Sequence, residues 1–230
     1  ALPIFPVVSR FMKGIFRMKP PTPRLSSTWN VKGLLEFLAT LDPPSDRTLK
    51  MLSLKLAALL ALTSSARAHE LVKLDLAFAS IKSYSWEFTL AKHTKVSRPG
   101  YPTRKIYLPA YPDNPKICVV RALQEYRSRT EKRRQSSRPL ISFVRPFKPI
   151  SSQTMSRWLR KAMQLASIAC HFTGHSIKSA STSAAAQAGV PLESILIAAD
   201  WSLFETFKRF YLRSPDRGEF ARAVLAALPE

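Results

Sequence analysis

Apolar residues recur at helical spacing over most of the chain, and this pattern predicts a largely helical protein. Residues 28–41 place leucine and phenylalanine on one face of a helix. Residues 43–63 are apolar on nearly all sides, so we expect this helix, capped by a serine or aspartate after two prolines, at the centre of the fold. Further helical segments are predicted at 115–134, 149–169, 175–189, 191–200, 203–213 and 215–228.

A region between residues 66 and 110 has a different period. Leu74, Leu76 and Phe78 alternate with other residues, which predicts a strand, and residues 83–92 and 104–110 are two more strand candidates on either side of a turn-rich stretch. Three short strands with helical segments on both sides of them predict an α+β fold.

The clearest linker is residues 19–28, "KPPTPRLSST", whose prolines exclude a helix. One short amphipathic helix is predicted before it. The linker therefore separates a short N-terminal segment from the main body of the chain.

The charge of the chain narrows the choice of partner. Lysine and arginine number 36 against 15 aspartates and glutamates, a net charge of +21. Such an excess favours an anionic partner, and we expect nucleic acid first and a membrane surface second. No apolar run reaches the ~18 residues that would span a bilayer, and no lipidation motif is visible. A basic structural nucleic-acid protein would have charged tails and few large aromatic residues, which this chain does not show.

The sequence has none of the common motifs for nucleotide binding, serine hydrolysis or zinc proteolysis, and its acidic residues are scattered. An enzyme acting on DNA here would rely on cations and a side-chain nucleophile. Arginine and lysine would neutralise the phosphate, a histidine or tryptophan N–H would donate to it, and a tyrosine would attack it.

Four stretches carry a resemblance to tyrosine recombinases. "TSSARAHELVKLDL" resembles their R-x-x-E-L motif, "GHSIKSASTSAA" their H-x-x-R motif, the following "GVPLESILIAADWS" the helix that comes next, and "WSLFETFKRFYLR" their nucleophile helix. The residues of these motifs, together with "SRPG" and "KPISSQTMSRWLRKAM", are most similar to those of the DIRS-like retrotransposon recombinases. The similarity extends over most of the chain and keeps the family's order of motifs.

The resemblance implies a set of site residues, one from each part of the pattern: Arg67, Lys95, His175, Lys178, Trp201 and Tyr211. Tyr211 would be the nucleophile that forms a 3′-phosphotyrosine. Arg67 and Lys178 would stabilise the phosphate, His175 would assist proton transfer, and Trp201 would donate to a phosphate oxygen. Each residue also has a structural alternative: His175 as a helix cap, Trp201 as core, and Tyr211 as part of an aromatic stripe.

Lys95 would protonate the leaving 5′-oxygen, with Lys92 and Lys105 as alternatives for this role. Glu70 is expected to brace Arg67 or His175.

Position 178 departs from the family, which has an arginine there. Lysine keeps the charge but loses the two-pronged grip on phosphate. Loss of one such donor typically slows a reaction by about 10²–10³. Three functions therefore remain open: a weakened recombinase, an inactive DNA-binding module, and a type IB topoisomerase.

The resemblance also implies an architecture and partners. The fold would be mostly helical with a small antiparallel sheet. Residues 1–25 would be the last helix and linker of an N-terminal DNA-clamping domain, and residues 26–230 the catalytic domain. We expect double-stranded DNA as the partner, a dimer or tetramer on DNA, no cofactor or metal, no membrane, and a nuclear location.

Overall fold

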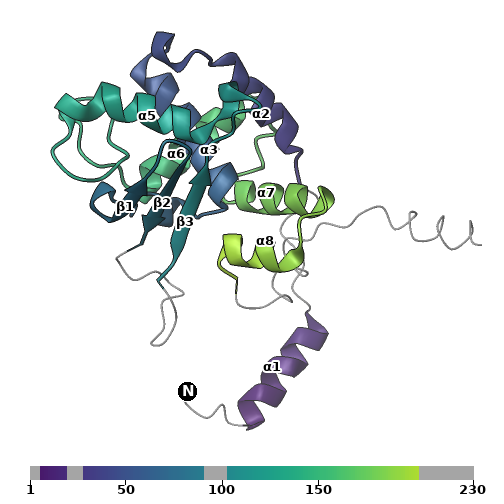
Figure 1. Ribbon diagram of the computed structural model, residues 1–230. Coiled ribbons are helices and arrows are strands. Elements are labelled where there is room, and N and C mark those ends of the chain that lie inside the picture. The colour runs from purple at the N-terminus through teal and green to yellow at the C-terminus, as the bar shows by residue number, and fades with distance from the viewer. Residues whose placement is uncertain (1–5, 20–27, 91–102, 202–230) are drawn as a thin grey trace, which may run out of the picture.

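The computed structural model describes residues 6–19, 28–90 and 103–201, and within them helices pack around a small antiparallel sheet (Figure 1). The sheet has the order β1-β2-β3, formed by Ala79–Ile81, Ser85–Thr89 and Lys105–Pro109. The α-helices are α1 (Pro6–Met18), α2 (Val31–Thr40), α3 (Leu49–Ser64), α4 (Ala68–Leu71), α5 (Val119–Thr130), α6 (Ser152–Leu165), α7 (Ser176–Gln187) and α8 (Leu192–Ala199). This is the predicted mostly helical α+β fold.

Helix α3 is the centre of the core, as its apolar sequence predicts. Residues from Leu52 to Ala61 are all buried, and α5, α6 and α7 pack around it. The start of the helix differs from the prediction. Pro44–Asp46 form a separate 3₁₀ turn, and the side chain of Thr48 caps α3 by accepting a hydrogen bond from the Met51 amide at 3.3 Å.

The sheet buries one face and exposes the other. Trp86 of β2 pairs with Leu108 of β3, Phe88 pairs with Ile106, and all four side chains are buried. The alternate positions face away from the core, and Tyr107 on this side is 54% exposed. Helices precede and follow the strands in the sequence, and in space α3 and α5 both contact β3.

The predicted strand through Leu74, Leu76 and Phe78 is wrong. Leu76–Phe78 is a 3₁₀ turn, because the Asp75 side chain accepts a hydrogen bond from the Ala77 amide at 3.0 Å. The strand begins only at Ala79.

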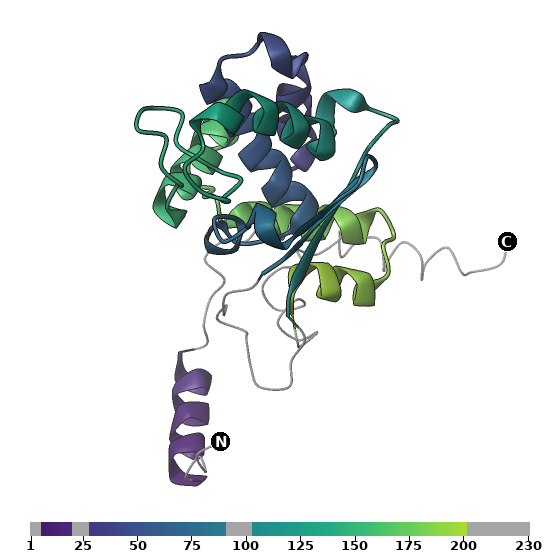
Figure 2. The same ribbon diagram turned by 60° about the vertical axis from the view of Figure 1, so that its left-hand side comes forward.

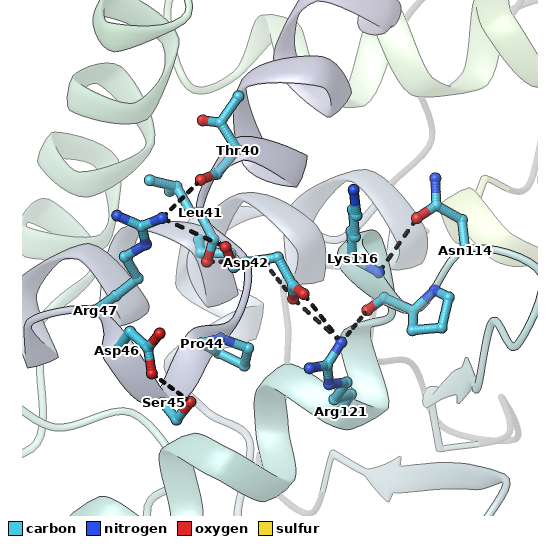
Figure 3. Close-up of polar contacts among 12 residues, drawn as sticks. Thr40, Leu41, Asp42, Pro44, Ser45, Asp46, Arg47, Asn114, Lys116 and Arg121 are labelled. Carbon is cyan, nitrogen blue, oxygen red and sulfur yellow. Dashed lines mark hydrogen bonds and ion pairs between the residues drawn. The ribbon is translucent and has the colours of Figure 1, made fainter.

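A polar network fixes the connection between α2 and α3 (Figure 3). The Arg47 guanidinium donates to the backbone oxygen of Thr40 at 3.1 Å. Arg121 of α5 pairs with the Asp42 carboxylate at 3.2 Å, and Lys55, buried in α3, lies 3.5 Å from the same carboxylate. These contacts tie the start of α3 to α5.

Helices α7 and α8 lie side by side next to β3 (Figures 1 and 2). Helix α7 contacts α3, and its small residues include the buried Ala180 and Thr182. Gly189, with φ of 79°, follows α7 and permits the turn into α8, as predicted. Asp200 has φ of 53° and ends α8.

Helix α1 is the predicted N-terminal amphipathic helix. It lies apart from the other described elements (Figures 1 and 2), and none of its residues is buried. Phe11 and Met12 of its apolar face are 65% and 58% exposed. None of the helices in the described ranges is long and apolar enough to cross a membrane.

Candidate active site

Arg67 lies immediately before the short helix α4, at the C-terminal end of the central helix. Its backbone amide donates to Glu70 Oε2 at 2.6 Å, and its guanidinium Nη1 lies 3.3 Å from Glu70 Oε1. The side chain of Arg67 remains 29% exposed. A single glutamate thus holds both ends of Arg67, and part of the side chain stays open to solvent.

Glu70 is completely buried and is the acidic centre of the site. Arg104, the residue before β3, places Nη1 2.6 Å from Glu70 Oε1. Burial alone would raise the pKa of the Glu70 carboxyl, but Arg104, Arg67 and Lys178 outweigh it and hold that pKa below its ordinary value. The predicted bracing of Arg67 by Glu70 is confirmed.

Lys178 lies on α7 and is only 5% exposed. Its Nζ donates to the backbone oxygen of Ala199, at the end of α8, over 2.5 Å. The same Nζ lies 4.8 Å from the centre of the half-buried Trp201 ring, a cation–π contact. Lys178 is therefore bound within the protein by the last residue of α8 and by Trp201.

The surroundings of Lys178 lower the pKa of its amine. Burial lowers its pKa to about 7, and repulsion from Arg67 and Arg104 acts in the same direction. Glu70 and Asp200 partly oppose this shift. With Lys178 protonated, three cations face two carboxylates, so the cluster carries an excess positive charge that suits an anion.

His175 directly precedes α7 and is exposed. Its side chain makes no capping hydrogen bond, so the structural alternative of a helix cap is not supported. It lies three residues before Lys178 and hence on the same side of α7.

Two contacts hold the start of α7 in place. Trp29 Nε1 donates to Ser176 Oγ at 2.8 Å in the core. A Cβ atom at Gly174 would lie 3.3 Å from Leu159 Cβ of α6, so only glycine allows this approach without a shift. The backbone that carries His175 and Lys178 is thus fixed from two sides.

The remaining predicted residues are not all described. Tyr211, Lys95 and Lys92 lie outside the described residues. Lys105 points to the exposed face of the sheet, where it pairs with Glu87 at 3.0 Å and is 61% exposed. The structure thus brings together Arg67, Lys178 and Trp201, with His175 nearby on α7.

Sequence reasoning missed Arg104. Its side chain is 8% exposed and joins Glu70 to Asp200 Oδ2, which lies 3.7 Å away. Strand alternation could have indicated this burial, because Arg104 has the same parity as the buried Ile106 and Leu108. Within the described part of the chain, no group of His, Cys, Asp or Glu side chains could hold a metal ion.

Comparison with solved structures identifies the fold. The XerH site-specific recombinase, in a post-cleavage complex with palindromic difH substrate, has a TM-score of 0.66 over 88% of this chain, at 11% identity. The fold is that of the tyrosine recombinase catalytic domain.

Two other structures with this recombinase fold are similar. The Tn1549 transposon integrase in complex with transposon right end DNA matches at a TM-score of 0.62 and 16% identity, over 93% of this chain and 70% of its own. A lambda integrase dimer bound to a COC′ core site matches at 0.56 and 15%, over 92% and 71%. The present chain spans about half of the XerH chain, 53%. No protein-family model and no curated protein matches the sequence.

Proposed function

We propose that this protein cleaves and rejoins DNA strands through a tyrosine–phosphate intermediate. The observation that carries the proposal is the convergence of Arg67, Lys178 and Trp201 around the buried Glu70, within a tyrosine recombinase fold. A cluster with excess positive charge, part of it open to solvent, is what a DNA phosphate requires.

In this proposal the Tyr211 hydroxyl attacks the phosphorus atom and forms a 3′-phosphotyrosine, while the 5′-oxygen leaves. Arg67 and Lys178 neutralise the non-bridging oxygens, and Trp201 donates its N–H to one of them. Lys95 protonates the leaving oxygen and His175 assists the transfer of protons. The phosphotyrosine conserves the energy of the broken bond for rejoining.

The proposed partner is double-stranded DNA, bound by a dimer or tetramer. The net charge of +21 supports DNA as the partner. So do the DNA complexes of XerH and of the Tn1549 integrase. The dimer of lambda integrase on its core site supports DNA binding by an oligomer. We further propose that the chain derives from a DIRS-like retrotransposon, acts in the nucleus, and begins with part of a DNA-clamping domain at residues 1–25.

One observation favours a second candidate, a DNA-binding module without cleavage activity. Lys178 Nζ is bonded to Ala199 and is almost fully buried. If DNA does not draw Lys178 away from this carbonyl, Arg67 faces the phosphate without Lys178, since among the described cations of the cluster it is the one whose side chain is partly exposed.

A covalent-adduct assay separates the two candidates. The probe is a randomised pool of nicked DNA duplexes, in which cleavage near the nick releases a short fragment and traps the protein on DNA. We expect an adduct on a denaturing gel with the wild type and none with Tyr211→Phe. Tyr107→Phe is the matched control, because Tyr107 is exposed on the sheet face away from the core.

Retained DNA binding without any wild-type adduct would establish the second candidate. Relaxation of supercoiled plasmid without strand exchange, in the presence of the adduct, would indicate a topoisomerase instead.

A further inference from the structure

The side chain of Arg104 is buried, which is unusual for an arginine. It precedes β3, and its backbone oxygen accepts a hydrogen bond from Leu90, which extends the ladder between β2 and β3. Its side chain is only 8% exposed, whereas that of the next residue, Lys105, is 61% exposed. Burying a guanidinium is costly unless charged or polar partners surround it.

The partners of Arg104 come from two separate elements. Nη1 lies 2.6 Å from Glu70 of α4 and 3.7 Å from Asp200. Nη2 donates to the backbone oxygen of Ala198, in the last turn of α8, at 3.2 Å. One planar side chain therefore links the sheet, the glutamate that holds Arg67, and the end of α8.

The end of α8 is held by a second cation as well. Lys178 of α7 donates to Ala199, the residue next to the one that Arg104 holds. The last carbonyls of a helix carry partial negative charge, so cations at this end stabilise it. Trp201 follows directly, and its amide bonds back to Leu196 at 3.0 Å. The position of Trp201 therefore depends on how the end of α8 is held.

We propose that Arg104 is a positioning residue of the phosphate site, which fixes the end of α8 and Trp201 relative to Arg67. The inference rests on the proposed function. Lysine at 178 supplies a single charged point that can rotate, whereas the fork of Arg104 sets both distance and angle. Arg104 thus gives the end of α8 a rigid guanidinium contact from the sheet, which the lysine at 178 does not provide. It does so without touching DNA.

The first test measures position without any DNA. Amide hydrogen exchange of the segment 196–201 is compared between the wild type, Arg104→Gln and Lys105→Gln. The matched control, Lys105→Gln, removes the same charge from the adjacent residue, but on the exposed face. We expect exchange to accelerate tenfold or more in Arg104→Gln and to stay at the wild-type rate in Lys105→Gln. Equal exchange in all three proteins would overturn the proposal.

The second test measures cleavage and binding separately, on the duplex recovered from the nicked pool. A positioning residue should change the rate of the chemical step, since small misplacements around a reacting phosphate cost about 10²-fold. We expect adduct formation by Arg104→Gln to slow by ~10- to 100-fold while the DNA dissociation constant stays within about threefold. Arg104→Lys should remain slow, because it keeps the charge but not the fork. A fall in affinity with no change in rate, or full activity in Arg104→Lys, would contradict the role.

A third variant covers the case in which Arg104→Gln does not fold. Asp200→Asn removes the outer ionic partner and leaves the pair of Arg104 with Glu70 in place. It should also accelerate exchange over 196–201, and a wild-type rate would count against the proposal. If the wild type forms no adduct at all, the proposed function fails, but the exchange measurements still decide whether Arg104 holds α8.

Discussion

The sequence resemblance matches Lys178 to an arginine of the tyrosine recombinases, and the burial of Lys178 adds a second difference between the two side chains. An arginine keeps its charge at every physiological pH. The Lys178 amine, with its pKa lowered to about 7 by burial and by Arg67 and Arg104, is charged only below that pH. The net charge of the site therefore depends on whether Lys178 is protonated.

A pH dependence of cleavage follows. If the charged form of Lys178 is needed, the second-order rate constant of cleavage (kcat/KM) should fall as pH rises through about 7, because the amine loses its proton there. Lys178→Arg should abolish this fall and raise the rate by about ten- to a thousandfold, as expected for regaining one transition-state donor. Single-turnover cleavage of the recovered duplex, followed from acidic to alkaline pH, measures both effects.

His175 provides the control, because this residue is itself proposed to assist proton transfer. In His175→Gln the fall that belongs to Lys178 should persist. If Lys178→Arg instead lowers activity at every pH, the pocket is adapted to lysine, and Lys178 is not a weakened copy of the family's arginine.

At the scale of elements, the start of α7 is held by the hydrogen bond between Trp29, just ahead of α2, and Ser176. Their coupling can be measured with Trp29→Phe, Ser176→Ala and the double variant. A buried hydrogen bond of this kind contributes about 1 kcal/mol, so we expect a coupling of that size in the free energy of unfolding. Denaturant unfolding of the four proteins gives the value.

A coupling near zero would mean that the two side chains contribute independently, and that the start of α7 is fixed by its approach to α6 at Gly174 instead.

The elements that the sequence predicts well are those with an unambiguous apolar pattern. Helix α3, apart from its start, and strands β2 and β3 lie where the pattern places them, since α3 is apolar on nearly all sides and apolar residues alternate in the strands. The stretch from Leu74 to Phe78 fails because it is too short to separate a strand from a turn, and the Asp75 side chain decides in favour of the turn. Local hydrogen bonds of this kind leave no trace in the spacing of apolar residues.

The site was predictable only in part. The resemblance singles out Arg67, Lys178 and Trp201, and these residues do meet in the structure. Arg104 carries no motif, and among 36 lysines and arginines only its parity with the buried Ile106 and Leu108 distinguishes it. Its partner Asp200 ends α8 with a φ of 53°, a backbone angle that the sequence does not reveal.

For the whole molecule, the net charge of +21 leads to a prediction about salt. Each phosphate that a lysine or arginine neutralises releases counterions, so DNA affinity should fall steeply as salt rises. Between about 50 and 200 mM salt we expect at least a tenfold loss, and ~10³-fold if six or more contacts form. Fluorescence anisotropy of a labelled duplex measures the dissociation constant at each salt concentration.

The same titration with Tyr211→Phe should give the same slope, because one hydroxyl adds no counterion release. A flat response in the wild type would point to a partner other than DNA.

The contact between Lys178 and Trp201 also gives the protein a natural optical probe. The other tryptophans, Trp29, Trp86 and Trp158, are buried in the core, while Trp201 is half-buried with a cation 4.8 Å from its ring centre. Indole emission responds to the electric field of a nearby charge. The emission wavelength of Trp201 therefore depends on the protonation and position of the Lys178 amine. Movement of Lys178 away from the ring would thus shift the fluorescence of the unlabelled protein in solution. This movement distinguishes the proposed enzyme from a DNA-binding module without cleavage activity.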